Sequence, residues 1–149
     1  MKKLISVLLI LALMFSVAHA AKLDEIVEEY NYEAEIMQLP QITTMPIDGT
    51  FFCIETGILI MFIKSETSDD IDLISCCTFG KPNCEGFLMT VCAILNMVDK
   101  SETVLNYGRM MNSFILAKRN GSVLVRTYND HAGQITCKPD QYTFFIQLF

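Results

Sequence analysis

Apolar residues recur every three or four positions along the segment AKLDEIVEEYNYEAEIM at 21–37, and acidic residues fill most of the positions between them. This spacing predicts an amphipathic helix whose carboxylates form a solvated face rather than a cation site. Pro40 and Pro46 follow, and the backbone restriction before proline favours an extended connector after the helix. The apolar stripe consists of Leu23, Ile26, Val27, Tyr30, Ala34 and Met37.

Two strands are predicted in TFFCIETGILIMFIK, with a short turn at 55–57 between them. The run 58–63 is apolar at every position, which is typical of a strand in the middle of a sheet. A third strand is predicted in IDLISCCTF at 71–79. Glu55 is the one acid next to these apolar runs whose burial is worth checking, although its turn position explains it better.

The segment CEGFLMTVCAILNMV is apolar nearly all round, and Asn83 before it suits a helix N-cap. It therefore predicts the buried helix of the domain. Ser101 suits the cap of a second, shorter helix through ETVLNYGRMMN. The methionines of this region are interpreted as adaptable core filling: Met89, Met97, Met110 and Met111.

Asn120-Gly121 lies between two β-prone runs in SFILAKRNGSVLVRTYND, and this dipeptide predicts a two-residue β-hairpin turn. QITC and YTFFIQLF add one or two further strands around the turn KPDQ. The element order predicts an α+β fold. It comprises an antiparallel sheet of about six strands, with one buried helix and one or two amphipathic helices packed on one face.

The first twenty residues, MKKLISVLLILALMFSVAHA, have the two lysines, short apolar run and small-residue end of a secretory signal. Cleavage is expected between Ala20 and Ala21, which leaves a single domain over 21–149 that is secreted or periplasmic. The apolar run is shorter than the roughly 20 residues of a membrane-spanning helix. The mature chain is therefore expected not to be integral to the membrane, and retention of the segment as an uncleaved anchor is the alternative.

Charge narrows the range of partners. The mature chain carries nine Lys and Arg residues against 17 Asp and Glu residues, a net charge of −8. A surface of this sign repels phosphate backbones, so nucleic acid is not expected as a partner.

An even number of cysteines in an exported chain predicts a disulfide framework. Structural zinc sites pair ligands two to four residues apart, whereas the clustered cysteines here are spaced by one, seven and eight residues. The sequence also lacks a C-x-x-C motif, so neither a metal nor a redox cofactor is expected. A strained bond between the adjacent Cys76 and Cys77 is the switch-like alternative. The disulfide candidates are Cys53, Cys76, Cys77, Cys84, Cys92 and Cys137.

Helix and strand geometry limits how these cysteines pair. Cys84 and Cys92 are eight residues apart on one predicted helix, about 12 Å along its axis, which exceeds the reach of a disulfide. Cys76 and Cys77 point to opposite faces of a strand. The short loop before Cys84 makes it a natural partner for either of them. This leaves Cys53, Cys92, Cys137 and the remaining vicinal cysteine, which either pair with one another or leave two of the four reduced and buried.

Catalytic chemistry has one candidate. His131, in the predicted turn NDHAGQ, is the single histidine of the mature chain, with Asp130 beside it and Cys137 six residues on. The chain has no G-x-S-x-G, no H-E-x-x-H and no glycine-rich phosphate loop. A solvated turn position is the commoner role for such a histidine.

The sequence thus favours a small exported, disulfide-stabilised binding protein without an identifiable catalytic centre, whose partner is an unknown protein or small molecule. A hydrolase or thiol-dependent enzyme that uses His131 with Cys137 or a nearby carboxylate is the first alternative. A structural protein of the envelope is the second. Asn120-Gly121-Ser122 matches a glycosylation sequon, which matters only in a eukaryotic host.

Overall fold

The computed structural model describes residues 22–44, 49–53, 56–80, 83–100, 103–127 and 131–148. These residues form three helices and six strands. The helices are α2 (Leu23–Ile36), α3 (Cys84–Val98) and α4 (Thr103–Asn120). The strands are β1 (Thr50–Cys53), β2 (Ile58–Lys64), β3 (Ile71–Thr78), β4 (Ser122–Arg126), β5 (Ala132–Lys138) and β6 (Gln141–Gln147).

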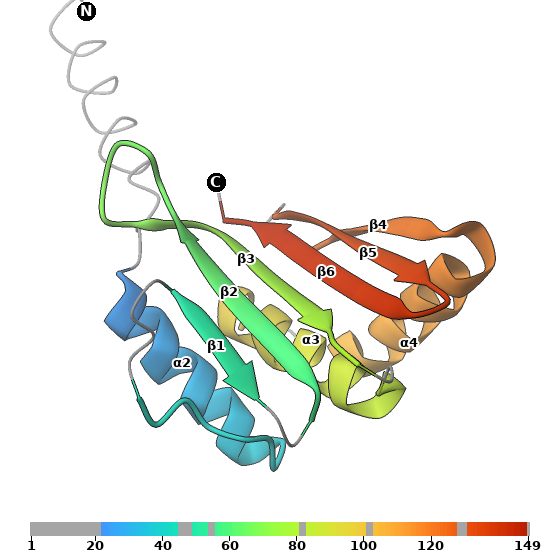
Figure 1. Cartoon of the computed structure of the whole chain (residues 1–149), viewed down its shortest axis with the longest axis horizontal. Helices are drawn as coiled ribbons and strands as arrows, with labels where there is room; N and C mark the ends of the chain where they lie inside the picture. Colours follow the sequence, from blue (N-terminus) through green and yellow to red (C-terminus); the bar gives the residue numbers. More distant parts are fainter. Residues whose placement is uncertain are drawn as a thin grey trace, which may run out of the picture.

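All six strands belong to one antiparallel sheet, in the order β1-β2-β3-β6-β5-β4. Each half of the sheet is a three-stranded meander. The two meanders meet where β3 pairs with β6, with Ser75 opposite Phe145. The three helices lie behind the sheet, on one of its faces (Figure 1). This arrangement confirms the predicted α+β fold with helices on one face.

The helix α3 occupies the centre of the helical layer and contacts both α2 and α4. Phe87, Val91 and Ile94 are completely buried, which confirms the predicted buried helix. Its first turn is capped as predicted, because the Asn83 Oδ1 atom accepts a hydrogen bond of 3.0 Å from the Gly86 backbone N–H.

The core lies between this helical layer and the sheet. Directly opposed residues of antiparallel strands share a face, so Cys76 projects to the same side as Ile60 on β2 and Phe144 on β6. All of these side chains are buried. The helix-facing residues of the sheet include Ile58, Ile60, Phe62, Ile74, Cys76, Ile135, Phe144 and Ile146.

The prediction of a β-hairpin turn at Asn120-Gly121 is wrong. Residues 113–120 continue α4, and Gly121, with φ of 86°, follows its last residue. Asn-Gly also suits a helix C-terminus, where glycine adopts the left-handed conformation without steric cost. Met110, Phe114 and Ala117 are buried at helical spacing, so the core selects the helix over the β-prone local sequence.

Most other predicted elements are confirmed, namely the helix near 23–36 and the strands assigned to β1, β2, β3, β5 and β6. The predicted signal segment 1–20, Pro46, Glu55, Ser101 and Asp130 lie outside the described residues. Within the part of the chain that is described, no helix has both the length and the apolar character needed to cross a membrane.

Candidate functional site

The cysteines were the main candidate site residues of the sequence, and all six are unpaired in the structure. The structure therefore does not support the predicted disulfide stabilisation of the fold. Cys76 is buried against the helices while Cys77 lies half-buried on the other face, as the strand geometry predicts. Cys84 and Cys92 both belong to α3, which confirms that they are too far apart to pair.

Four side chains form what we call the thiol cluster: Cys84, Lys118, Cys137 and Tyr142. Cys84 is the first residue of α3, and its thiol donates a hydrogen bond of 3.3 Å to the Tyr142 hydroxyl oxygen. The Lys118 Nζ atom, in the last turn of α4, lies 4.0 Å from Cys84 Sγ. Cys137 stands directly opposite Tyr142 in the β5–β6 register, so both side chains leave the same face of the sheet.

Aromatic packing holds the cluster in place. The Tyr142 ring meets the Phe114 ring edge-on at 5.0 Å and lies 5.7 Å from the Phe87 ring. The Lys118 ammonium lies 5.4 Å from the centre of the Phe114 ring and 5.5 Å from that of Tyr142, within the range of cation–π attraction. A cation is thereby kept beside a half-buried thiol.

Electrostatic coupling links the four groups. Negative charge on Cys84 raises the pKa of the exposed Lys118 ammonium. The hydrogen bond from Cys84, followed by burial, raises the pKa of Tyr142. Burial raises the pKa of the Cys137 thiol, and Lys118 opposes that shift. Both thiols therefore interact with the same lysine.

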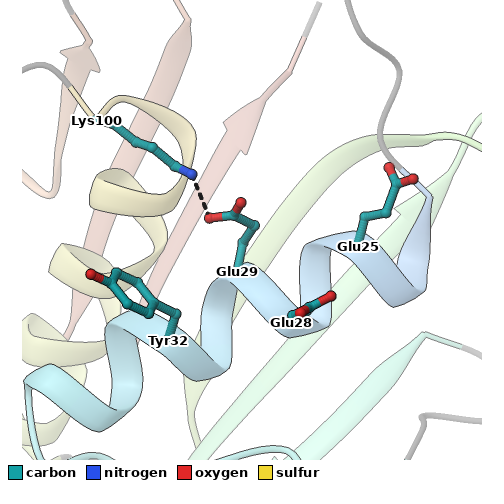
Figure 2. Close-up of a pocket in the computed structure, with 5 residues that line it drawn as sticks. All are labelled: Glu25, Glu28, Glu29, Tyr32 and Lys100. Atoms are coloured by element: carbon teal, nitrogen blue, oxygen red, sulfur yellow. Dashed lines mark ion pairs between the residues drawn. The ribbon is translucent and has the colours of Figure 1, made fainter.

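An acidic groove runs along the outer side of α2, with a cavity of about 480 Å³ lined by Glu25, Glu28, Glu29, Tyr32 and Lys100. Figure 2 shows Lys100 reaching toward Glu29, and its Nζ atom lies 2.7 Å from Glu29 Oε2. Both side chains are substantially exposed, and an ion pair of this kind adds little stability. Most carboxylates of α2 thus form the solvated face that the sequence predicts.

Glu33 is the exception on α2, because its side chain is buried. Its Oε2 atom accepts a hydrogen bond of 3.2 Å from Asn96 Nδ2 on α3, and Asn96 is buried too. This polar contact between the two helices has no distinct sequence signal, since Glu33 looks like its exposed neighbours. No group of three His, Cys, Asp or Glu residues in the described segments has the arrangement of a metal site.

His131 lies directly before β5. Its backbone N–H donates a hydrogen bond of 3.1 Å to the Thr127 hydroxyl, and its carbonyl accepts one from the Thr127 N–H. Cys137 is near the far end of the same strand, about 20 Å away at the usual rise per residue. The structure therefore does not bring His131 and Cys137 together. Asn120 of the sequon is exposed at the end of α4.

The face of the sheet opposite the helices is the remaining candidate, and we call it the open face (Figure 1). Its central residues alternate with the buried ones along β2, β3 and β6, and none of them is charged. Ile63 is 46% exposed and Phe145 is 39% exposed. The central residues are Leu59, Met61, Ile63, Leu73, Ser75, Cys77, Thr143, Phe145 and Gln147.

Comparison of the chain with protein-family models, with curated proteins and with solved structures gives no match. The candidate sites are accordingly defined by geometry: the open face as a binding surface and the thiol cluster as a chemical site. Sequence reasoning missed Lys118 and Tyr142, because nothing in the local sequence marks them as neighbours of Cys84. The uncharged alternate positions of YTFFIQLF are a signal that would have indicated the open face.

Proposed function

We propose that this protein is a small exported binding protein whose open face receives a protein partner with an uncharged, apolar surface. The single observation that supports it is the absence of charge at the central residues of the open face. The chain as a whole is acidic, with a formal net charge of −6. A solvated sheet face normally carries polar and charged side chains, whereas this one exposes Ile63 and Phe145 and leaves Leu59 and Met61 only partly buried.

The size of the open face suits a protein rather than a small molecule. Six strands spaced 4.8 Å apart and about seven residues long make a face of roughly 600 Å². A partner that covered it would bury about 1,200 Å² in total, at the lower end of the range for specific complexes.

Site-specific photo-crosslinking tests this surface. The photoreactive residue p-benzoylphenylalanine replaces Phe145 on the open face or, as the matched control, Tyr32, which is an exposed aromatic residue on α2. We expect a covalent adduct in the producing cells at position 145 and none at position 32. Mass spectrometry of the adduct identifies the partner, and an adduct with a second copy identifies the chain itself.

The complex reconstituted from purified components supplies the second half of the test. Phe145→Lys is expected to lower the affinity of this complex at least tenfold, since burial of an unpaired charge in an apolar contact is costly. Equal adducts at positions 145 and 32, or no adduct at 145, would contradict the proposal. Far-UV circular dichroism of Phe145→Lys shows separately whether the variant is folded.

Export and disulfide stabilisation belong to the same proposal. The segment 1–20 supports export, and the even cysteine count supports oxidation in the compartment that it leads to. Intact mass with and without reduction is the measurement. We expect a chain that begins at Ala21 and lacks four or six hydrogens before reduction. A protein with six free thiols after isolation from that compartment would refute the disulfide part.

A further inference from the structure

Strand spacing and the two faces of the sheet exclude several of the possible cysteine pairs. Cys76 is two strands away from both Cys53 and Cys137, about 9.6 Å sideways, which exceeds the Cα separation of a disulfide. Cys77 projects from the open face, while Cys84 contacts Tyr142 on the helix face. The predicted pairing of Cys84 with Cys77 is therefore blocked by the sheet between them.

We propose that Cys84 and Cys137 are a reactive dithiol that forms a disulfide across the thiol cluster. Both are half-buried rather than enclosed in the core, so a soluble reagent reaches them. The Lys118 Nζ atom lies 4.0 Å from Cys84 Sγ and interacts electrostatically with Cys137. The Tyr142 hydroxyl that contacts Cys84 belongs to the residue directly opposite Cys137. Formation of the disulfide replaces the hydrogen bond from Cys84 to Tyr142. Its use in the cell rests on the proposed export, whereas the chemistry below does not.

Cys84 is the attacking thiol of the pair. It is the first residue of α3, where the helix dipole favours negative charge, and the Lys118 ammonium lies 4.0 Å from its sulfur. Cys137 belongs to the last pair but one of the β5–β6 pairing, and its backbone N–H donates a hydrogen bond of 2.9 Å to the carbonyl of Gly121, directly after the C-terminus of α4. A helix C-terminus disfavours negative charge beside it. Cys137 acts as the resolving thiol.

The co-reactant is a disulfide compound, and the exchange balances in two steps. Cys84, after loss of its proton, attacks one sulfur of the compound, forms a mixed disulfide and releases one thiolate. Cys137, after loss of its own proton, attacks Cys84 Sγ, forms the Cys84–Cys137 bond and releases the second thiolate. The two protons end on the released thiols, and the two electrons of the protein thiols reduce the disulfide compound. Lys118 offsets the negative charge on Cys84 during the first step.

Oxidation of the purified, fully reduced protein with glutathione disulfide tests the pair. After N-ethylmaleimide has blocked the remaining thiols, peptide mapping is expected to find the Cys84 peptide joined to the Cys137 peptide. The bond closes a loop of about 54 residues and is expected to raise the melting temperature by roughly 10 °C. A bond from Cys84 to Cys76, or both Cys84 and Cys137 found blocked by N-ethylmaleimide, would overturn the proposal.

Serine variants separate the two roles. Cys137→Ser is expected to accumulate glutathione on Cys84, because the resolving thiol is missing. Cys84→Ser is expected to leave Cys137 unmodified over the same time. Cys77→Ser is the matched control on the open face and is expected to form the bond at the normal rate. Glutathione on Cys137 in Cys84→Ser, at the rate seen for Cys84, would show that the order of attack is wrong.

Lys118 is a positioning residue, so its test needs a measurement that responds to the charge of the side chain and not to its packing. Lys118→Met is expected to slow the first step about threefold or more, while Lys118→Arg retains the cation and most of the rate. Equal rates in both variants would remove Lys118 from the mechanism. None of these measurements depends on export or on the open face, so their failure is distinguishable from a failure of the proposed function.

Discussion

Single residues show how burial controls the chemistry of the thiols. Cys92 on α3 is completely buried, and burial raises its pKa to about 12. Cys76 on β3 is equally enclosed, and burial raises its pKa as well. Tyr30 on α2 is also buried, and burial raises the pKa of its hydroxyl. These three groups keep their protons in the folded protein at a pH where the unfolded chain releases those of the thiols.

The reduced protein is therefore expected to lose stability as the pH rises above about 9. A folded-state pKa that is raised above the unfolded value contributes stability that is complete below the unfolded pKa. That stability is lost above it, because the unfolded state then binds fewer protons. The free energy of unfolding is expected to fall by about 1.4 kcal/mol per pH unit for each buried thiol. Urea unfolding of the reduced protein at several pH values between 7.5 and 10.5 measures this slope.

Cys92→Ala is the control for this pH dependence. It removes one of the buried thiols, so the fall in the free energy of unfolding with pH above pH 9 is expected to become shallower by the contribution of one proton. A slope that is unchanged in Cys92→Ala would mean that this thiol is accessible to solvent in the folded protein. The comparison uses slopes, so the loss of core packing in the variant does not affect it.

At the level of elements, α4 shows that local signals and core packing can disagree. The apolar run SFILA and the following Asn-Gly favour a β-hairpin, yet Phe114 packs against the rings of Phe87 and Tyr142, and Ala117 is completely buried. Ile115, between them, is 48% exposed. On a strand Ile115 and Ala117 would share one face, whereas on a helix they point in different directions.

A pair of glutamate substitutions tests the helix. Ala117→Glu is expected to cost about 3 kcal/mol or more, because it places a carboxylate in the core. Ile115→Glu is expected to change the free energy of unfolding by about 0.5 kcal/mol or less, since the side chain points to water. Urea unfolding of the two variants measures both. Equal destabilisation at the two positions would indicate a strand at 113–118.

For the whole molecule, the central pairing of β3 with β6 ties the two meanders into one sheet. The Ser75 hydroxyl adds a hydrogen bond of 3.1 Å to the Phe144 carbonyl across this junction. The contact joins residues 69 positions apart. The two halves are therefore expected to unfold together, as the predicted single domain over 21–149 requires.

Hydrogen exchange followed by mass spectrometry tests this cooperativity. The slowest amides are expected in β3, β6 and α3, which form the middle of the two layers, and the fastest in the edge strands β1 and β4. Protection that is uniformly low in β1–β3 and high in β4–β6, or the reverse, would mean that the meanders open as separate units.

Local patterns were sufficient for the elements whose stability depends on their own residues. The apolar stripe of α2, the nearly continuous apolar surface of α3 and its Asn83 cap follow from period and side-chain chemistry. The alternation in β6 likewise follows from the two faces of a strand. From these elements and their short connections, the α+β class and the covering of one sheet face could be derived.

Tertiary packing was needed wherever distant residues choose between local alternatives. The sequence permits both a hairpin and a helix at 113–121, and burial of Ala117 selects the helix. The sheet order brings Tyr142 beside Cys137, and α3 and α4 then bring Cys84 and Lys118 to them. No local pattern encodes that meeting, because each contact depends on segments tens of residues apart. Hydrophobic period predicts which face of an element is buried, whereas long-range packing determines which side chains meet there.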